Sequence, residues 1–118
     1  MIRESDIKES ADIKKILEII INSIDPEKII LFGSQAKGNA KEDSDYDICI
    51  LKDSIKKRRQ VTQNLYMEFF GSNLAIDLIV ETPNRFEELK DNPYMVYKSI
   101  NENGVLIYDK RDAGKTVA

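Results

Sequence analysis

Residues 31–51 read LFGSQAKGNAKEDSDYDICIL: the end of one apolar run, a turn of small residues, and two aspartates in front of a second apolar run. Gly33 ends the first run, KIILF (28–32), and Asp45 and Asp47 open the second. Short runs rich in β-branched residues and bounded by glycine or polar residues are typical of β-strands. Residues i and i+2 of a strand point to the same face, so we expect the two carboxylates to lie side by side.

The flanking sequence predicts further strands and several helices. Apolar residues spaced by three and four indicate helices, whereas β-branched runs indicate strands. The predicted helices cover about 6–24, 55–70, 85–90 and the segment from Asn92-Pro93 to Gly104, and the predicted strands cover 28–32, 45–51, 73–80 and 105–108. Tyr66, Phe69 and Phe70, at helical spacing, are expected in the core. This order predicts an α/β fold whose sheet is covered by helices on at least one face.

Length and composition exclude several classes of protein. The 118 residues predict one domain over 1–109 and a disordered tail over 110–118, which has no periodicity. No apolar run approaches the roughly 18 residues of a membrane span, and MIRESDIKES lacks the apolar centre of a signal peptide, so we expect a cytoplasmic protein without a membrane partner. With one cysteine and no histidine, an internal disulfide and a histidine-ligated zinc site are excluded. The net charge of −3 argues against direct nucleic-acid binding.

A third aspartate strengthens the case for a metal site. Asp77 lies between Ile76 and Leu78 in a predicted strand that is otherwise apolar, where an unpaired charge is unfavourable. If this strand neighbours the one that starts at Asp45, three carboxylates converge, and such oxygen ligands suit Mg²⁺ beside substrate phosphates. Taken singly, each aspartate is better explained as a cap or a surface ion pair. The trio together favours a metal site.

Gly33-Ser34 is a candidate phosphate-binding turn. A glycine after a strand lets the backbone approach a ligand closely, and Ser34 is expected to cap a short helix that starts at Gln35. Free amides at such a helix start favour phosphate, although an ordinary tight turn would show the same residues. Gly33 and Gly38 also give the outline of a P-loop, but Asn39-Ala40 replaces the Lys and Ser/Thr that a P-loop requires.

Gly33-Ser34, ten intervening residues and Asp45-Tyr46-Asp47 resemble the GS-x10-DxD signature of the polymerase beta-like nucleotidyltransferase superfamily. More closely, the stretch resembles the minimal nucleotidyltransferase (MNT) domains of bacteria and archaea. These typically read FGSRARG, a short variable stretch and SDIDLLV, with a third Asp on a later strand, as Asp77 is here. INENGVLIY, residues 100–108, is similar to the family's closing helix and strand, and the likeness covers about 14–108. The resemblance implies a nucleotidyltransferase fold, α/β (α+β), with a small mixed sheet flanked by helices.

The resemblance also implies a magnesium-dependent enzyme. Asp45 and Asp47 would hold Mg²⁺, expected to be two ions, against a nucleoside triphosphate. Asp77 would complete the site as a metal ligand and base, which makes all three both catalytic and metal-binding candidates. The implied reaction transfers AMP from ATP to an acceptor hydroxyl and releases pyrophosphate.

The implied nucleotide-binding residues are Gly33, Ser34 and Lys37. The first two would hold the β and γ phosphates. Lys37 stands where many relatives carry Arg, so the charge is kept while the planar fork of the guanidinium is lost.

The acceptor must come from elsewhere, because the catalytic core takes up almost the whole chain. The resemblance implies a separately encoded toxin of the HEPN type (higher eukaryotes and prokaryotes nucleotide-binding), since MNT domains commonly serve as its antitoxin and some modify a toxin tyrosine with AMP. Our leading hypothesis is therefore an antitoxin that adenylylates its partner toxin. The alternatives are a non-catalytic antitoxin that only covers the toxin, and nucleotidyl transfer to a small molecule by a homodimer. Both homo- and hetero-oligomers are compatible with the sequence.

Overall fold

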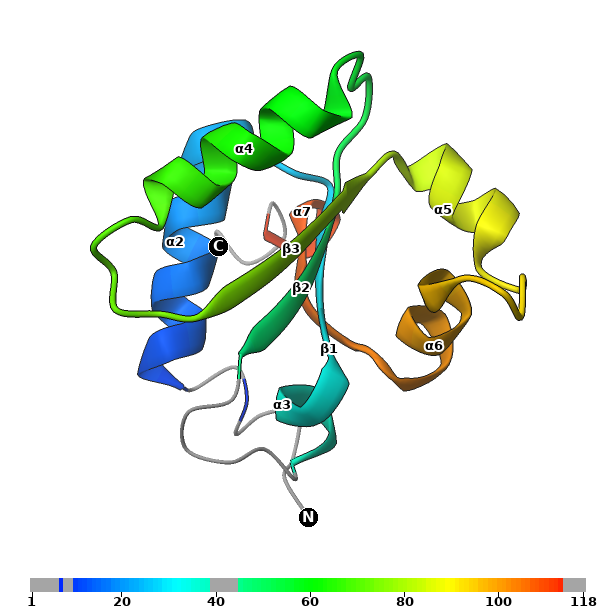
Figure 1. Cartoon of the computed structure of the whole chain (residues 1–118), viewed down its shortest axis with the longest axis horizontal. Helices are drawn as coiled ribbons and strands as arrows, with labels where there is room; N and C mark the ends of the chain where they lie inside the picture. Colours follow the sequence, from blue (N-terminus) through cyan, green and yellow to red (C-terminus); the bar gives the residue numbers. More distant parts are fainter. Residues whose placement is uncertain (1–6, 8–9, 39–44, 114–118) are drawn as a thin grey trace.

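The computed structural model describes residues 7, 10–38 and 45–113. Within these residues, four strands form one sheet of order β3-β2-β1-β4 (Figure 1). β1 (Lys28–Phe32) is antiparallel to both β2 (Tyr46–Leu51) and β4 (Val105–Asp109), whereas β3 (Ile76–Glu81) is parallel to β2. The predicted α/β fold with a small mixed sheet is therefore confirmed.

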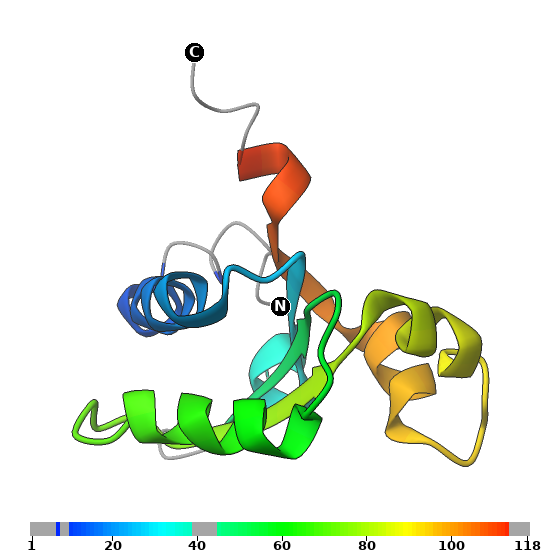
Figure 2. The same cartoon turned by 90° about the horizontal axis from the view of Figure 1, so that it is seen from above.

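Helices cover both faces of the sheet (Figure 2). One face carries α2 (Ala11–Ile24) and α4 (Arg58–Glu68), and the other carries α5 (Pro83–Leu89) and α6 (Val96–Asn103). Two short helices, α3 (Gly33–Lys37) and α7 (Lys110–Ala113), directly follow β1 and β4. In the part of the chain that the structure describes, no helix is long and apolar enough to cross a membrane.

Alternation along the strands divides the core into two clusters. Ile48 and Ile50 of β2 belong to the cluster that packs against α2 and α4. Cys49 and Leu51 belong to the cluster that packs against Phe86, Tyr97 and Ile100 of α5 and α6. Because side chains of a strand alternate between faces, Asp47 shares the face of Cys49 and Leu51. The candidate site therefore lies on the face that α5 and α6 cover.

Some elements begin or end away from their predicted limits. α2 begins at Ala11, where the Ser10 side chain accepts a hydrogen bond from the Ile13 amide; the predicted start, residue 6, lies outside the described residues. β3 begins at Ile76 rather than at residue 73, because Asn73 has a φ of 65° and cannot continue an extended strand. α6 begins at Val96 rather than at the predicted Asn92-Pro93.

The segment after β4 is also more ordered than predicted. Residues 110–113, expected to be part of a disordered tail, form α7. The Lys110 ammonium contacts the Asp25 carboxylate at 2.7 Å, and Arg111 holds Asp109 through Nη2–Oδ2 and Nε–Oδ1 contacts of 2.8 and 3.1 Å. These ion pairs fix the helix to the sheet and to the end of α2. The rest of the predicted tail, 114–118, lies outside the described residues.

The Asp109–Arg111 pair predicts a dependence of stability on pH. Its hydrogen bonds lower the pKa of Asp109 from 3.8 to about 2. The folded state therefore holds this proton less tightly than the unfolded state, so the stabilisation is complete above pH 3.8 and is lost as the pH falls toward 2. We expect wild type and Asp109→Asn to differ in unfolding free energy above about pH 5, and the difference to shrink toward about pH 2, in urea titrations. A difference that stays constant over this range would contradict the assignment.

The buried charge in β3 is Glu81, not Asp77. Asp77 is exposed, so the expectation that its charge lies in an apolar environment was wrong. Glu81, at the carboxyl end of β3, is only 3% exposed. Its Oε1 accepts hydrogen bonds from Arg58 Nη1 at 2.6 Å and from Tyr97 Oη at 2.7 Å, which ties α4 and α6 to the sheet.

Glu81→Ala is expected to lower the free energy of unfolding by about 2 kcal/mol, because it leaves the buried Tyr97 hydroxyl without its acceptor and removes the partner of the half-exposed Arg58 guanidinium. Burial, together with the hydrogen bond to Glu81, raises the pKa of Tyr97 to about 12, so this hydroxyl stays a donor. Urea unfolding would measure the change. Glu87→Ala is the matched control: it removes a 2.6 Å ion pair with Lys90 from a largely exposed carboxylate and should have a much smaller effect. Equal losses in the two variants would contradict a structural role for Glu81.

Candidate functional site

Three segments that are far apart in the sequence meet at one end of the sheet (Figure 1). In the antiparallel pair β1–β2, Phe32 lies opposite Asp47, and in the parallel pair β2–β3, Asp47 lies opposite Asp77. Gly33 follows Phe32 directly. The strand pairing on which the predicted meeting of the aspartates depended is therefore present.

Gly33 is needed because the Asp47 carboxylate occupies the space of a side chain. Its φ is +73°, a conformation that favours glycine, and a Cβ atom built at this position would collide with Asp47 Oδ2. The sequence predicted that this glycine permits a close approach. In the structure, the group that approaches is the carboxylate of a candidate site residue.

The site carries negative charge that the described residues do not compensate. Asp47 is half-buried, whereas Asp45 and Asp77 are exposed. Burial raises the pKa of Asp47, and the charges of Asp77 and Asp45 raise it further. Among the described residues, none of the three forms an ion pair. A cation at this position would offset the repulsion.

The described residues contain no group of three or more Asp, Glu, Cys or His side chains that could hold a metal ion by themselves. The sheet instead pairs Asp47 with Asp77, and Asp45 lies two residues before Asp47. Mg²⁺ in nucleotide sites is commonly held by one or two carboxylates, with substrate phosphates and waters as the other ligands. Asp47 and Asp77, which form no ion pair within the described part of the chain, therefore fit a magnesium ion that arrives with a nucleotide.

The turn after β1 differs in detail from its prediction. α3 begins at Gly33 rather than at Gln35, and Phe32, not Ser34, is its N-cap, without a side-chain capping bond. Ser34 is half-buried in the first turn of α3. Lys37, the last residue of α3, is exposed. All three predicted nucleotide-binding residues thus belong to one short helix next to Asp47.

Sequence reasoning missed the tyrosines that contact this region. The hydroxyl of Tyr66, on α4, accepts a hydrogen bond from the Leu78 amide at 2.8 Å and donates one to Asp77 Oδ1 at 3.4 Å. The Tyr46 hydroxyl donates to Asp12 Oδ2 at 2.8 Å, which joins the start of β2 to α2. Tyr66 and Phe70 were expected in the core together with Phe69, but only Phe69 is buried: Tyr66 is 39% exposed at the edge of β3, and Phe70 is 88% exposed. No sequence signal marked Tyr66, because its role depends on where α4 lies against β3.

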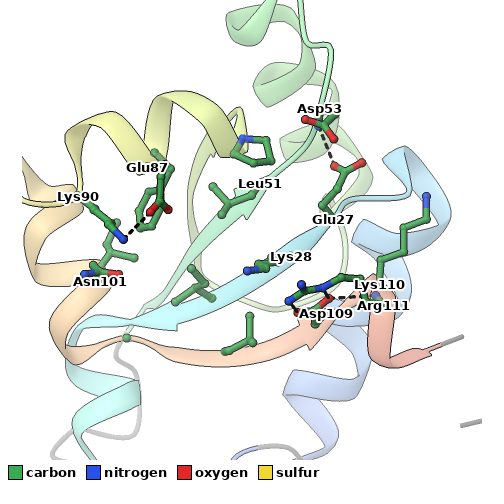
Figure 3. A pocket seen from close by; sticks show the side chains of 16 residues that line it. Glu27, Lys28, Leu51, Asp53, Glu87, Lys90, Asn101, Asp109, Lys110 and Arg111 are labelled. Carbon is green, nitrogen blue, oxygen red and sulfur yellow. Dashed lines mark hydrogen bonds and ion pairs between the residues drawn. The ribbon is translucent and has the colours of Figure 1, made fainter. Parts of the chain in front are cut away.

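A cleft of about 830 Å³ lies away from these residues (Figure 3). It is lined by Lys28, the first residue of β1, and by Leu51, the last residue of β2, so it is at the end of the sheet opposite to Gly33 and Asp47. Charged side chains at its rim form pairs with one another: Glu87 with Lys90 at 2.6 Å, and Asp109 with Arg111 at 2.8 Å. None of the predicted site residues lines this cleft. We therefore place the candidate site at the carboxylates rather than in the cleft.

Comparisons with known proteins agree with this fold. The sequence model of the family described as "Polymerase beta, Nucleotidyltransferase" matches residues 14–113, a range that includes every predicted site residue. No curated protein matches the chain at a significant level. A chain in the crystal structure of a toxin-antitoxin with AMP-PNP is 20% identical, with a TM-score of 0.58 over 86% of this chain and 77% of that one. A protein of Sulfolobus solfataricus, described as a nucleotidyltransferase, is also 20% identical, with a TM-score of 0.58 over 92% of this chain and 85% of that one.

Proposed function

Because this chain belongs to the polymerase beta nucleotidyltransferase family, we propose that it transfers AMP from ATP to an acceptor hydroxyl and releases pyrophosphate. The observation that carries the proposal is the register of the sheet, which sets Asp47 opposite Asp77 and beside Gly33. Carboxylates that form no ion pair with any residue that the structure describes, next to a turn whose backbone is open to close approach, suit a metal-bound triphosphate.

Each residue of the site has a role in this reaction. Asp45, Asp47 and Asp77 would hold magnesium, expected to be two ions, which when bound neutralises charge on the attacking and leaving oxygens. The amides of Gly33 and Ser34 would donate hydrogen bonds to the β and γ phosphates, with the Lys37 ammonium nearby. Asp77, exposed at the edge of the sheet, would accept the proton of the acceptor hydroxyl. The acceptor oxygen then forms a bond to the α phosphorus as the bond to pyrophosphate breaks.

The proposed acceptor is a tyrosine hydroxyl of a HEPN-type toxin encoded nearby. Support comes from the fold shared with a chain of a toxin-antitoxin structure that contains AMP-PNP. It also comes from the exposure of Asp77, because an exposed base can be reached by a hydroxyl on a large partner. Phe70 and Tyr94 are 88% and 94% exposed, and exposed aromatic side chains are enriched where proteins meet.

The test is to incubate the purified protein with Mg²⁺, ATP and its neighbouring gene product, with label on either the α or the γ phosphate. The proposal expects α label on the partner and no transfer of γ label. Transfer of the γ label alone would mean phosphoryl transfer and would overturn it.

A second function, neutralisation of the toxin by complex formation alone, is favoured by the same exposed aromatic residues. The double variant Asp45→Asn, Asp47→Asn separates the two functions. If it loses both label transfer and neutralisation, the enzymatic account holds. If it still neutralises the toxin while wild type transfers no label, the protein is a binding antitoxin.

A further inference from the structure

The outer edge of β3 presents backbone groups that β2 does not use. In the β2–β3 pairing, the Tyr46 amide donates to Ala75 O and the Lys52 amide donates to Glu81 O, so the odd-numbered residues of β3 bond toward β2. In a parallel ladder, the residues between them point their amides outward. The Leu78 amide therefore faces the open edge, where it donates to the Tyr66 hydroxyl at 2.8 Å.

This bond fixes the direction in which the Tyr66 hydroxyl can donate. A phenol has one hydrogen, and its oxygen already accepts from the Leu78 amide, so the hydrogen is available to the neighbouring carboxylate. Asp77 Oδ1 accepts it at 3.4 Å. The first bond is short and the second is long, so the hydroxyl is held firmly by the backbone and bonds only weakly to the carboxylate. A weak bond of this kind restricts the rotation of the carboxylate without blocking its second oxygen.

Tyr66 stands on a rigid part of the fold. Its neighbour Leu65 is 1% exposed and Phe69, one turn later, is 6% exposed, and both belong to the core between α4 and the sheet. Asp77 itself is exposed, and among the described residues its side chain has no other hydrogen bond or ion pair. Among the described residues, the group that bonds to the Asp77 carboxylate is therefore the Tyr66 hydroxyl, which the Leu78 amide holds and whose helix packs on the core.

We infer that Tyr66 is a positioning residue, which holds the Asp77 carboxylate in the orientation in which it binds a divalent cation and accepts a proton. The inference rests on the role proposed above for Asp77. Tyr66 belongs to α4, outside the three segments that supply the site residues. Its proposed role is to support Asp77, the third carboxylate.

The test compares Tyr66→Phe with Tyr94→Phe, which removes the same atom from a tyrosine that is 94% exposed. Binding of the Mn²⁺ complex of AMP-PNP is measured by calorimetry, alone and in an Asp77→Ala background. Tyr66→Phe is expected to weaken binding about tenfold, the lower end of the range for residues that support a metal ligand, and Tyr94→Phe to leave it unchanged. In the Asp77→Ala background, Tyr66→Phe should have no further effect, because the group through which it acts is gone.

Two results would overturn the inference. Binding by Tyr66→Phe equal to that of wild type would mean that the hydroxyl does not position Asp77. An equal loss with and without Asp77 would mean that Tyr66 only supports the backbone at Leu78. The proposed function can fail separately from the positioning role. If the effect of Tyr66→Phe requires Asp77 but wild type transfers no AMP to its partner, Tyr66 still positions Asp77, whereas the proposed reaction is wrong. Absence of binding by wild type would overturn both.

Discussion

Asp47→Asn is expected to slow AMP transfer by at least about a hundredfold while leaving the protein at least as stable as wild type. The loss of activity follows from removing a proposed metal ligand and its charge. The retained stability follows from the electrostatics of the site: burial, Asp77 and Asp45 all raise the pKa of Asp47, so its charged form is disfavoured in the fold. Asparagine has nearly the same shape without the charge. Transfer rates and urea unfolding would measure the two effects.

Asp53→Asn is the matched control. Asp53 is exposed and lines the cleft at the other end of the sheet, so this change should leave the transfer rate unaltered. Equal activity of wild type and Asp47→Asn would place the chemistry elsewhere. A large loss of stability in Asp47→Asn would instead mean that the carboxylate serves the fold.

Gly33→Ala is expected to abolish transfer and to destabilise the protein. The φ of +73° strains any residue with a side chain, and the new methyl group would occupy the position of Asp47 Oδ2. The carboxylate would have to leave its place, or the turn would have to move away from β2. Either movement separates the phosphate-binding turn from the carboxylate.

Gly71→Ala isolates the backbone part of this effect. Gly71 has a φ of +82°, but a Cβ atom there meets nothing within 4 Å. The Gly71→Ala substitution should lower the free energy of unfolding by about 1–2 kcal/mol and leave the transfer activity unchanged. If Gly33→Ala proved as mild and as active as Gly71→Ala, the close contact between Gly33 and Asp47 would not matter for function.

The sequence predicted those features of the site that depend on local pattern. Gly33 after one β-branched run and Asp47 before the next located two strands and the turn between them, because glycine and alternating side chains have direct structural consequences. That Asp47 and Asp77 share a register required the two strands to be neighbours, and spacing alone cannot supply that. The resemblance to MNT domains implied that the two strands are neighbours, and in the structure β2 pairs with β3 so that Asp47 lies opposite Asp77.

Other features depend on how the helices lie against β3. Asp77 and Glu81 belong to the same strand and the same face, yet one is exposed and the other is 3% exposed. Their difference arises because α5 and α6 cover only one end of the strand, which no local pattern encodes. The contact of Tyr66 with Asp77 has the same origin, since it requires α4 to lie along the open edge of β3. The exposure of these carboxylates and the Tyr66–Asp77 contact therefore follow from the tertiary arrangement, which local sequence patterns do not encode.

A crystal structure of the protein with Mg²⁺ and AMP-PNP would test the placement of the site most directly. We expect a magnesium ion held by Asp47 and its neighbouring aspartates, with the β and γ phosphates against Gly33 and Ser34. A nucleotide bound instead in the cleft beside Lys28, with the carboxylates free of metal, would contradict this placement.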